Sequence, residues 1–149
     1  MLPRDPLEGC TSRVKLRELQ SGLVILRYLL GFALLGHTLA VFVQSALAGE
    51  FLSGTDPAVK FHELLAWIIL GICAVQIVIA ALLQRTGDAS LWLLIGSILI
   101  FLAEVLQTGT GYGRFLRVHI PVGVIVFAGV SWQLIAQFRR APREAGSIQ

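Results

Sequence analysis

Four long apolar segments constrain the fold of this 149-residue chain more than any other feature. They cover residues 22–48, 59–83, 90–107 and 115–138, and a bilayer core of about 30 Å requires roughly 20 apolar residues in helical form. Charged residues make up only 14% of the sequence, whereas soluble domains typically carry about 25%. We therefore expect an all-α integral membrane protein.

The breaks between the apolar segments are short and rich in turn-forming residues. They cover residues 49–57, 84–90 and 108–113, and the last of these holds three glycines. Short connections make neighbouring helices antiparallel, so the sequence predicts an up-down-up-down four-helix bundle. We expect one bundle over residues 22–140, with polar tails at 1–21 and 141–149.

The basic residues are distributed unequally between the two sides of the predicted bundle. One side holds three, which are Lys60, Arg114 and Arg117, and the side with both termini holds the remaining nine of the 12. The positive-inside rule then places both termini in the cytoplasm, as in a multi-pass protein of the bacterial inner (plasma) membrane. The net charge of +3 therefore reflects basic residues that set the orientation in the lipid bilayer, which is the expected partner. We expect no nucleic-acid partner.

Two of the three histidines, His62 and His119, lie early in the second and fourth segments. Both segments start on the same side of the bundle, so at about 1.5 Å of rise per residue the two side chains should lie at similar depth. Histidine within a membrane span marks a functional site by default. Helices two and four are diagonal in such a bundle, which favours a b-type haem (heme b) with His62 and His119 as its two iron ligands.

Residues around the two histidines fit this interpretation. Small residues one turn further on, Ala66 and Gly123, leave room for a macrocycle, and nearby basic side chains could pair with its propionates. The predicted cofactor site therefore comprises His62, His119, Ala66, Gly123, Lys60, Arg114 and Arg117. We expect its apolar wall to include Phe32, Phe42, Trp67 and Phe127.

Other interpretations stay open at this point. Histidines near helix ends can lie unliganded in the interfacial zone, and the chain would then be a cofactor-free accessory or assembly subunit of a membrane complex. A transporter or proton path through His37 and Glu104 is less favoured, because no helix is broken at matching positions in the two halves. We expect His37 to have a structural role, and Glu104 to lie near the outer end of the third segment.

The two halves of the chain show a weak internal repeat. Gln44, Gly49 and His62 in the first half correspond to Gln107, Gly109 and His119 in the second. Two apolar hairpins can match by chance, so both explanations stay open.

The runs at 61–66 (FHELLA) and 118–123 (VHIPVG) resemble one four-helix half of a haem A synthase. The pattern also resembles small bacterial membrane proteins with the same paired histidines. Haem A synthases have two such halves and carry a Glu a few residues before the helix-two histidine, where this chain has Ala58 and Val59. The resemblance therefore implies His62 and His119 as haem ligands, but not the oxidation of haem O to haem A.

A bis-histidine iron has no open position for oxygen, which favours one-electron transfer over oxygen chemistry. We thus expect a cytochrome b-like protein that transfers electrons or handles haem near the outer membrane face. A quinone or a redox partner protein is its expected partner. The sequence leaves enzymatic activity and homo-oligomer formation undecided.

Overall fold

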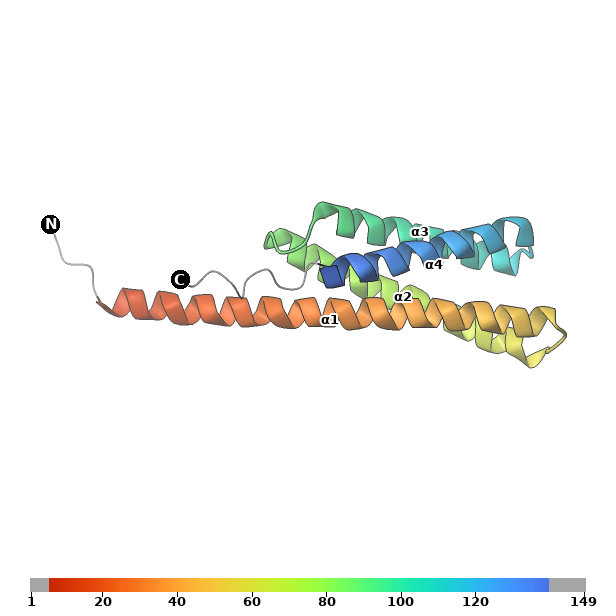
Figure 1. The fold of residues 1–149 in the computed structure, drawn as a ribbon, viewed down its shortest axis with the longest axis horizontal. Helices are drawn as coiled ribbons and strands as arrows, with labels where there is room; N and C mark the ends of the chain where they lie inside the picture. The colour runs from red at the N-terminus through yellow and green to blue at the C-terminus, as the bar shows by residue number, and fades with distance from the viewer. Residues whose placement is uncertain (1–5, 140–149) are drawn as a thin grey trace.

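The computed structural model describes residues 6–139, with side chains from Arg17 onward, and these residues form four α-helices (Figure 1). The helices are α1 (Pro6–Leu52), α2 (Pro57–Arg85), α3 (Leu91–Tyr112) and α4 (Leu116–Arg139). Their connections span only 53–56, 86–90 and 113–115. Because the links are so short, consecutive helices run antiparallel, as predicted.

The helices pack as a square. Helix α1 contacts α2 and α4, and α3 contacts the same two helices. The diagonal pairs are therefore α1 with α3 and α2 with α4, which confirms the predicted up-down-up-down arrangement. We call the end that carries connections 53–56 and 113–115 the hairpin end of the bundle. At the opposite end, α1 extends well beyond the other three helices (Figure 1).

All four helices are long and apolar enough to cross a membrane. Many large apolar side chains point outward, with Phe32 70% and Trp92 79% exposed. In water such a surface is unfavourable, but against lipid tails it is stable, since lipid is as apolar as the side chains. The chain is thus a multi-pass membrane protein. Its orientation across the bilayer stays a prediction, and the C-terminal tail at 141–149 lies outside the described residues.

The interior of the bundle is layered along its axis. Toward the chain ends lies an apolar cluster that includes Leu34, Leu83 and Val130. Near the hairpin end lies a second and smaller cluster, formed by Val41, Ile69 and Val126. His37 on α1 and Cys73 and Gln76 on α2 are buried between these clusters along their helices. Buried Glu104 follows Ala103 on α3, which packs against the second cluster.

The third helix is longer than predicted. We expected residues 108–113 to form a loop because glycine and threonine alternate there, yet α3 continues to Tyr112. A Cβ atom on Gly111 would lie 3.0 Å from Cε1 of His119, so this glycine lets the histidine of α4 pack against the helix. The turn itself is shorter and uses Arg114, whose φ of 54° lies in the left-handed region.

Gly96 provides a test of the packing between α3 and α4. A Cβ there would lie 2.7 Å from Nε2 of Gln133, which donates to the Leu93 carbonyl and to Ser97 Oγ, each at 3.3 Å. We expect Gly96→Ala to displace this amide and destabilise the fold by about 1–2 kcal/mol. Thermal unfolding in detergent checks this. Gly71→Ala is the control, because nothing lies within 4 Å of its Cβ. Equal melting temperatures for the two variants would contradict the prediction.

Candidate functional site

His62 and His119 come together inside the bundle, although they lie on diagonal helices. Their ring centroids are 6.0 Å apart and their planes are inclined by 56°. His62 lies in the second turn of α2 and His119 in the first turn of α4. Because both helices begin at the hairpin end, their first turns lie at similar depth and bring the two imidazoles together.

Each histidine is held by a backbone carbonyl of the preceding helix. Nδ1 of His62 lies 3.1 Å from the carbonyl oxygen of Gln44, and Nδ1 of His119 lies 2.8 Å from that of Gln107. A carbonyl only accepts, so Nδ1–H is the donor in both rings and Nε2 carries a lone pair. Within the described part of the chain, neither Nε2 has a hydrogen-bond partner. Metal-binding histidines are typically oriented by such a contact.

The weak internal repeat in the sequence corresponds to a repeated contact in the structure. In each half, a glutamine in the second half of one helix holds the histidine at the start of the next. The first half adds a second bond, from Nε2 of Gln44 to the His62 carbonyl at 2.9 Å. The glutamine backbone thus positions the histidine, a role that sequence reasoning missed.

A cavity of about 330 Å³ surrounds the two rings. This volume lies within the range of about 300–1,000 Å³ that is usual for small-molecule sites. Residues from all four helices line it. The apolar part includes Val41, Ala66, Ile69, Leu116 and Val126, and the polar part includes both histidines, Glu63, Glu104 and Arg114.

The spacing of the two imidazoles suits one shared metal ion. With about 2 Å from the ion to each ring nitrogen and about 1 Å more to each ring centre, a shared ion separates the centroids by roughly 6 Å. The observed separation is 6.0 Å. Two imidazoles that line one cavity, each with Nε2 unbonded among the described residues, form a ligand set typical of haem iron.

The other predicted site residues divide into two groups. Ala66 and Arg114 line the cavity, as the haem interpretation requires. Gly123 does not, because a Cβ on it would lie 2.7 Å from Nε2 of Gln107, so the glutamine side chain occupies the space we had reserved for a macrocycle. Lys60 and Arg117 are exposed and lie outside the cavity lining.

The expected aromatic wall lies elsewhere. Phe32, Phe42 and Trp67 are 58–70% exposed, and the rings of Phe42 and Phe127 pair at a centroid distance of 6.4 Å. None of the four lines the cavity. Side chains this large pack poorly between helices in close contact but fit against lipid. The apolar cavity wall is mainly aliphatic, and its aromatic members are Phe51 and Tyr112.

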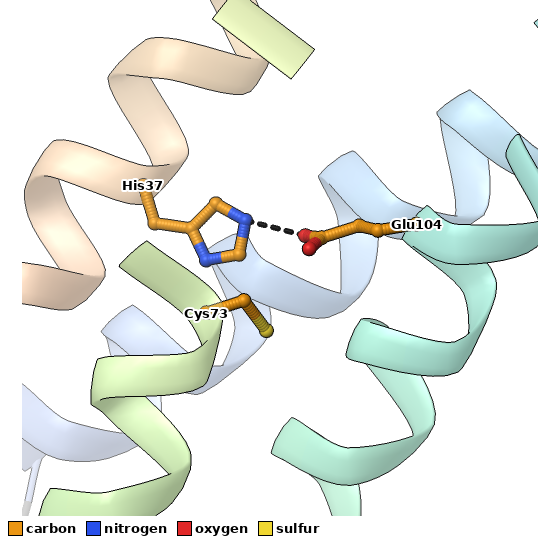
Figure 2. Close-up of side chains that lie close together, drawn as sticks. All are labelled: His37, Cys73 and Glu104. Carbon is orange, nitrogen blue, oxygen red and sulfur yellow. Dashed lines mark hydrogen bonds and ion pairs between the residues drawn. The ribbon is translucent and has the colours of Figure 1, made fainter. Parts of the chain in front are cut away.

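A second polar cluster lies deeper than the histidine pair. It brings together His37 and Glu104 (Figure 2), which the sequence suggested only as a less favoured proton path. Nε2 of His37 lies 2.6 Å from Oε1 of Glu104, and its Nδ1 lies 2.8 Å from Oε1 of Gln76. The Cys73 thiol lies close by. We had placed Glu104 near the end of its helix, but eight further residues follow it in α3, which puts it about 12 Å from that end. The misread end of α3 therefore placed Glu104 too close to the surface.

Comparison of the chain with protein-family models, curated protein sequences and solved structures gives no significant match. The resemblance to haem A synthase therefore stays a prediction from short motifs, and the functional argument rests on the geometry of the site.

The burial of the histidines predicts their reactivity. His37 is fully buried, whereas His62 and His119 are partly accessible and line the cavity. We expect diethyl pyrocarbonate to modify His62 and His119 in the detergent-solubilised apoprotein and to spare His37. Peptide mass spectrometry measures this. Modification of His37 at the same rate as the other two would contradict the packing of the deep cluster.

Proposed function

We propose that the chain is a membrane b-type haem protein that transfers single electrons, with His62 and His119 as axial ligands. The observation that carries this proposal is the pair of imidazoles 6.0 Å apart, each with Nδ1 on a carbonyl and Nε2 without a partner among the described residues. The cavity around the rings supports the proposal, because a porphyrin requires apolar surroundings and open space.

The chain's own residues would orient the group at its edge. Arg114 lines the cavity at the hairpin end, where a guanidinium can pair with a propionate in a bidentate contact. Lys60 and Arg117 do not line the cavity, so a role for them at the propionates stays a prediction. The haem itself supplies one-electron chemistry, since two histidine ligands leave no open position on the iron.

The proposed location is the bacterial plasma membrane, with both chain termini in the cytoplasm. The predicted orientation supports this location, and the cavity would then lie near the outer face. Glu63 and Tyr112, whose side chains are 2.6 Å apart, lie on the rim of the cavity and are exposed. We propose that this rim meets the electron partner, a quinone or a redox protein.

The test is an absorption spectrum of purified protein, oxidised and then reduced, with a pyridine haemochrome assay. We expect a low-spin b-haem spectrum at about one haem per chain. His62→Ala and His119→Ala should each lose the low-spin form, since each removes one of the two iron ligands. His37→Gln is the control, because this residue points into the deeper cluster, and it should keep both haem and spectrum.

A colourless protein, even after expression with added haem, would refute the proposal. The histidines would then be interfacial residues, and the accessory-subunit interpretation would take its place.

Gly111 gives a second test that leaves both ligands intact. A Cβ at this position would lie 3.0 Å from Cε1 and 3.2 Å from Nδ1 of His119. We expect Gly111→Val to turn the ring away from the Gln107 carbonyl and to lower haem occupancy by about tenfold, as for other contacts that orient a metal ligand. Gly109→Val is the matched control on the same helix, because nothing lies within 4 Å of its Cβ. Haem titration of the two apoproteins measures the difference.

A further inference from the structure

We propose that His37 and Glu104 form a buried proton-binding site that releases a proton when the haem is oxidised and takes one up when it is reduced. The inference rests on the proposed haem function. It assigns a task to the deep polar cluster, which haem ligation leaves unexplained.

The geometry of the pair requires one proton between its two members. Nδ1 of His37 faces Oε1 of Gln76 at 2.8 Å, so Nδ1–H donates and Nε2 keeps its lone pair. That lone pair faces Oε1 of Glu104 at 2.6 Å, and two acceptors repel each other at this distance unless a proton lies between them. If the Gln76 amide is turned over, Nδ1 accepts and Nε2–H donates to the carboxylate. Both arrangements place one proton in the contact, but only the first holds a proton that can leave a neutral imidazole behind.

The burial of the pair makes its charge sensitive to its surroundings. His37 is fully buried and Glu104 is 4% exposed. In the arrangement with Nδ1–H on Gln76, the shared proton leaves the pair neutral, which suits a membrane interior, whereas the turned amide would leave one buried negative charge, so the first arrangement is favoured. Oε2 of Glu104 is buried and has no partner among the described residues. A full charge on this carboxylate is therefore poorly compensated by the protein and depends on another charge nearby.

The haem cavity is where such a charge would change. Glu104 lines the cavity that also contains His62 and His119, so the carboxylate and the haem share one low-dielectric compartment. Ferric haem carries one positive charge more than ferrous haem, and charges interact strongly where the dielectric constant is low. The ferric state therefore stabilises an ionised Glu104, and the ferrous state stabilises the protonated pair.

The coupled step balances in charge and atoms. Oxidation sends one electron to an external one-electron acceptor, a quinone or an oxidised redox protein. The proton between Nε2 of His37 and Oε1 of Glu104 leaves through the cavity to water, which leaves a neutral imidazole beside a carboxylate. Reduction reverses both transfers.

The other ionisable groups near the pair come from α2, from α4 and from the connection 113–115. From α2, the Cys73 thiol donates to the Ser97 carbonyl at 3.7 Å, and His62 and Glu63 line the cavity. His119 of α4 lines the same cavity, and Arg114 of the connection lies at its rim. Glu63 is exposed and bonded to Tyr112, so water screens its charge. Glu104 is the carboxylate that combines burial with contact to the cavity.

A metal ion is the competing occupant of this cluster. The ligand atoms of His37, Cys73 and Glu104 all lie within 4.8 Å of one another (Figure 2). Two ligands of a tetrahedral zinc ion, each about 2 Å from the metal, lie roughly 3.3 Å apart. The His37–Glu104 contact of 2.6 Å is shorter than that, as expected for a shared proton.

The test is a spectroelectrochemical titration of the purified haem protein at a series of pH values. We expect the midpoint potential of the wild type to fall as the pH rises, by up to about 59 mV per pH unit for one proton per electron. Glu104→Gln keeps a hydrogen bond to His37 but has no ionisable proton, so the midpoint potential of the variant should be nearly independent of pH. His37→Gln is the second variant, and the same loss of pH dependence is expected for it. Glu63→Gln is the control, and its midpoint potential should keep the wild-type dependence on pH.

An infrared difference spectrum between the reduced and oxidised protein gives an independent measurement. The carbonyl band of a protonated carboxylic acid should appear on reduction in the wild type and in Glu63→Gln, and should be missing in Glu104→Gln. A pH-independent wild-type potential, with a normal low-spin spectrum, would overturn the proton site and leave haem binding intact. Stoichiometric zinc that is lost in Cys73→Ser would also overturn it. A colourless protein overturns the haem proposal and this coupling together.

Discussion

Polar side chains inside a membrane bundle have to find their partners within the bundle, and this requirement organises the interior of the protein. The hydrocarbon core offers no water to an unpaired donor or acceptor. The described interior accordingly holds its histidines in hydrogen bonds: His62 and His119 on backbone carbonyls, and His37 between Gln76 and Glu104. Apolar packing alone would allow many rotations of the helices, because every lipid-facing surface is equally apolar. These polar contacts select one of them.

The same contacts explain how His62 and His119 are oriented without further side-chain partners among the described residues. A carbonyl that accepts from Nδ1 fixes both the tautomer and the plane of the ring. In this protein the carbonyl belongs to the last turns of the preceding helix, so the hairpin that joins two helices also orients the histidine. Gly111 then lets the His119 ring lie against α3. The carbonyl contacts hold the two rings a fixed distance apart. The cavity is the space around the rings, and mainly aliphatic side chains line its apolar part.

Much of the fold could be predicted from the sequence, because helix length and apolar content are direct consequences of bilayer thickness. The four helices, their antiparallel order and the diagonal placement of His62 and His119 all follow from it, and the structure bears them out. What failed were inferences that depend on helix ends and side-chain direction. The glycines of 108–113 indicated a loop, and the resulting error in the end of α3 placed Glu104 too close to the surface. Phe32 and Trp67 suggested a cofactor wall, yet apolar residues face lipid and interior with equal ease.

Each diagonal pair of helices carries one of the two pairs of interacting polar residues. The pair α2 and α4 supplies His62 and His119 near the hairpin end, and the pair α1 and α3 supplies His37 and Glu104 at a deeper level. The ligand pair repeats the same contact in both halves of the chain, whereas the deep pair joins a histidine from one half to a carboxylate from the other. A symmetric helix pair would suit two equivalent ligands of one iron, as the proposed haem site requires. An asymmetric pair suits a proton, which requires one base and one acid, and Glu104 connects it to the cavity that the ligands enclose.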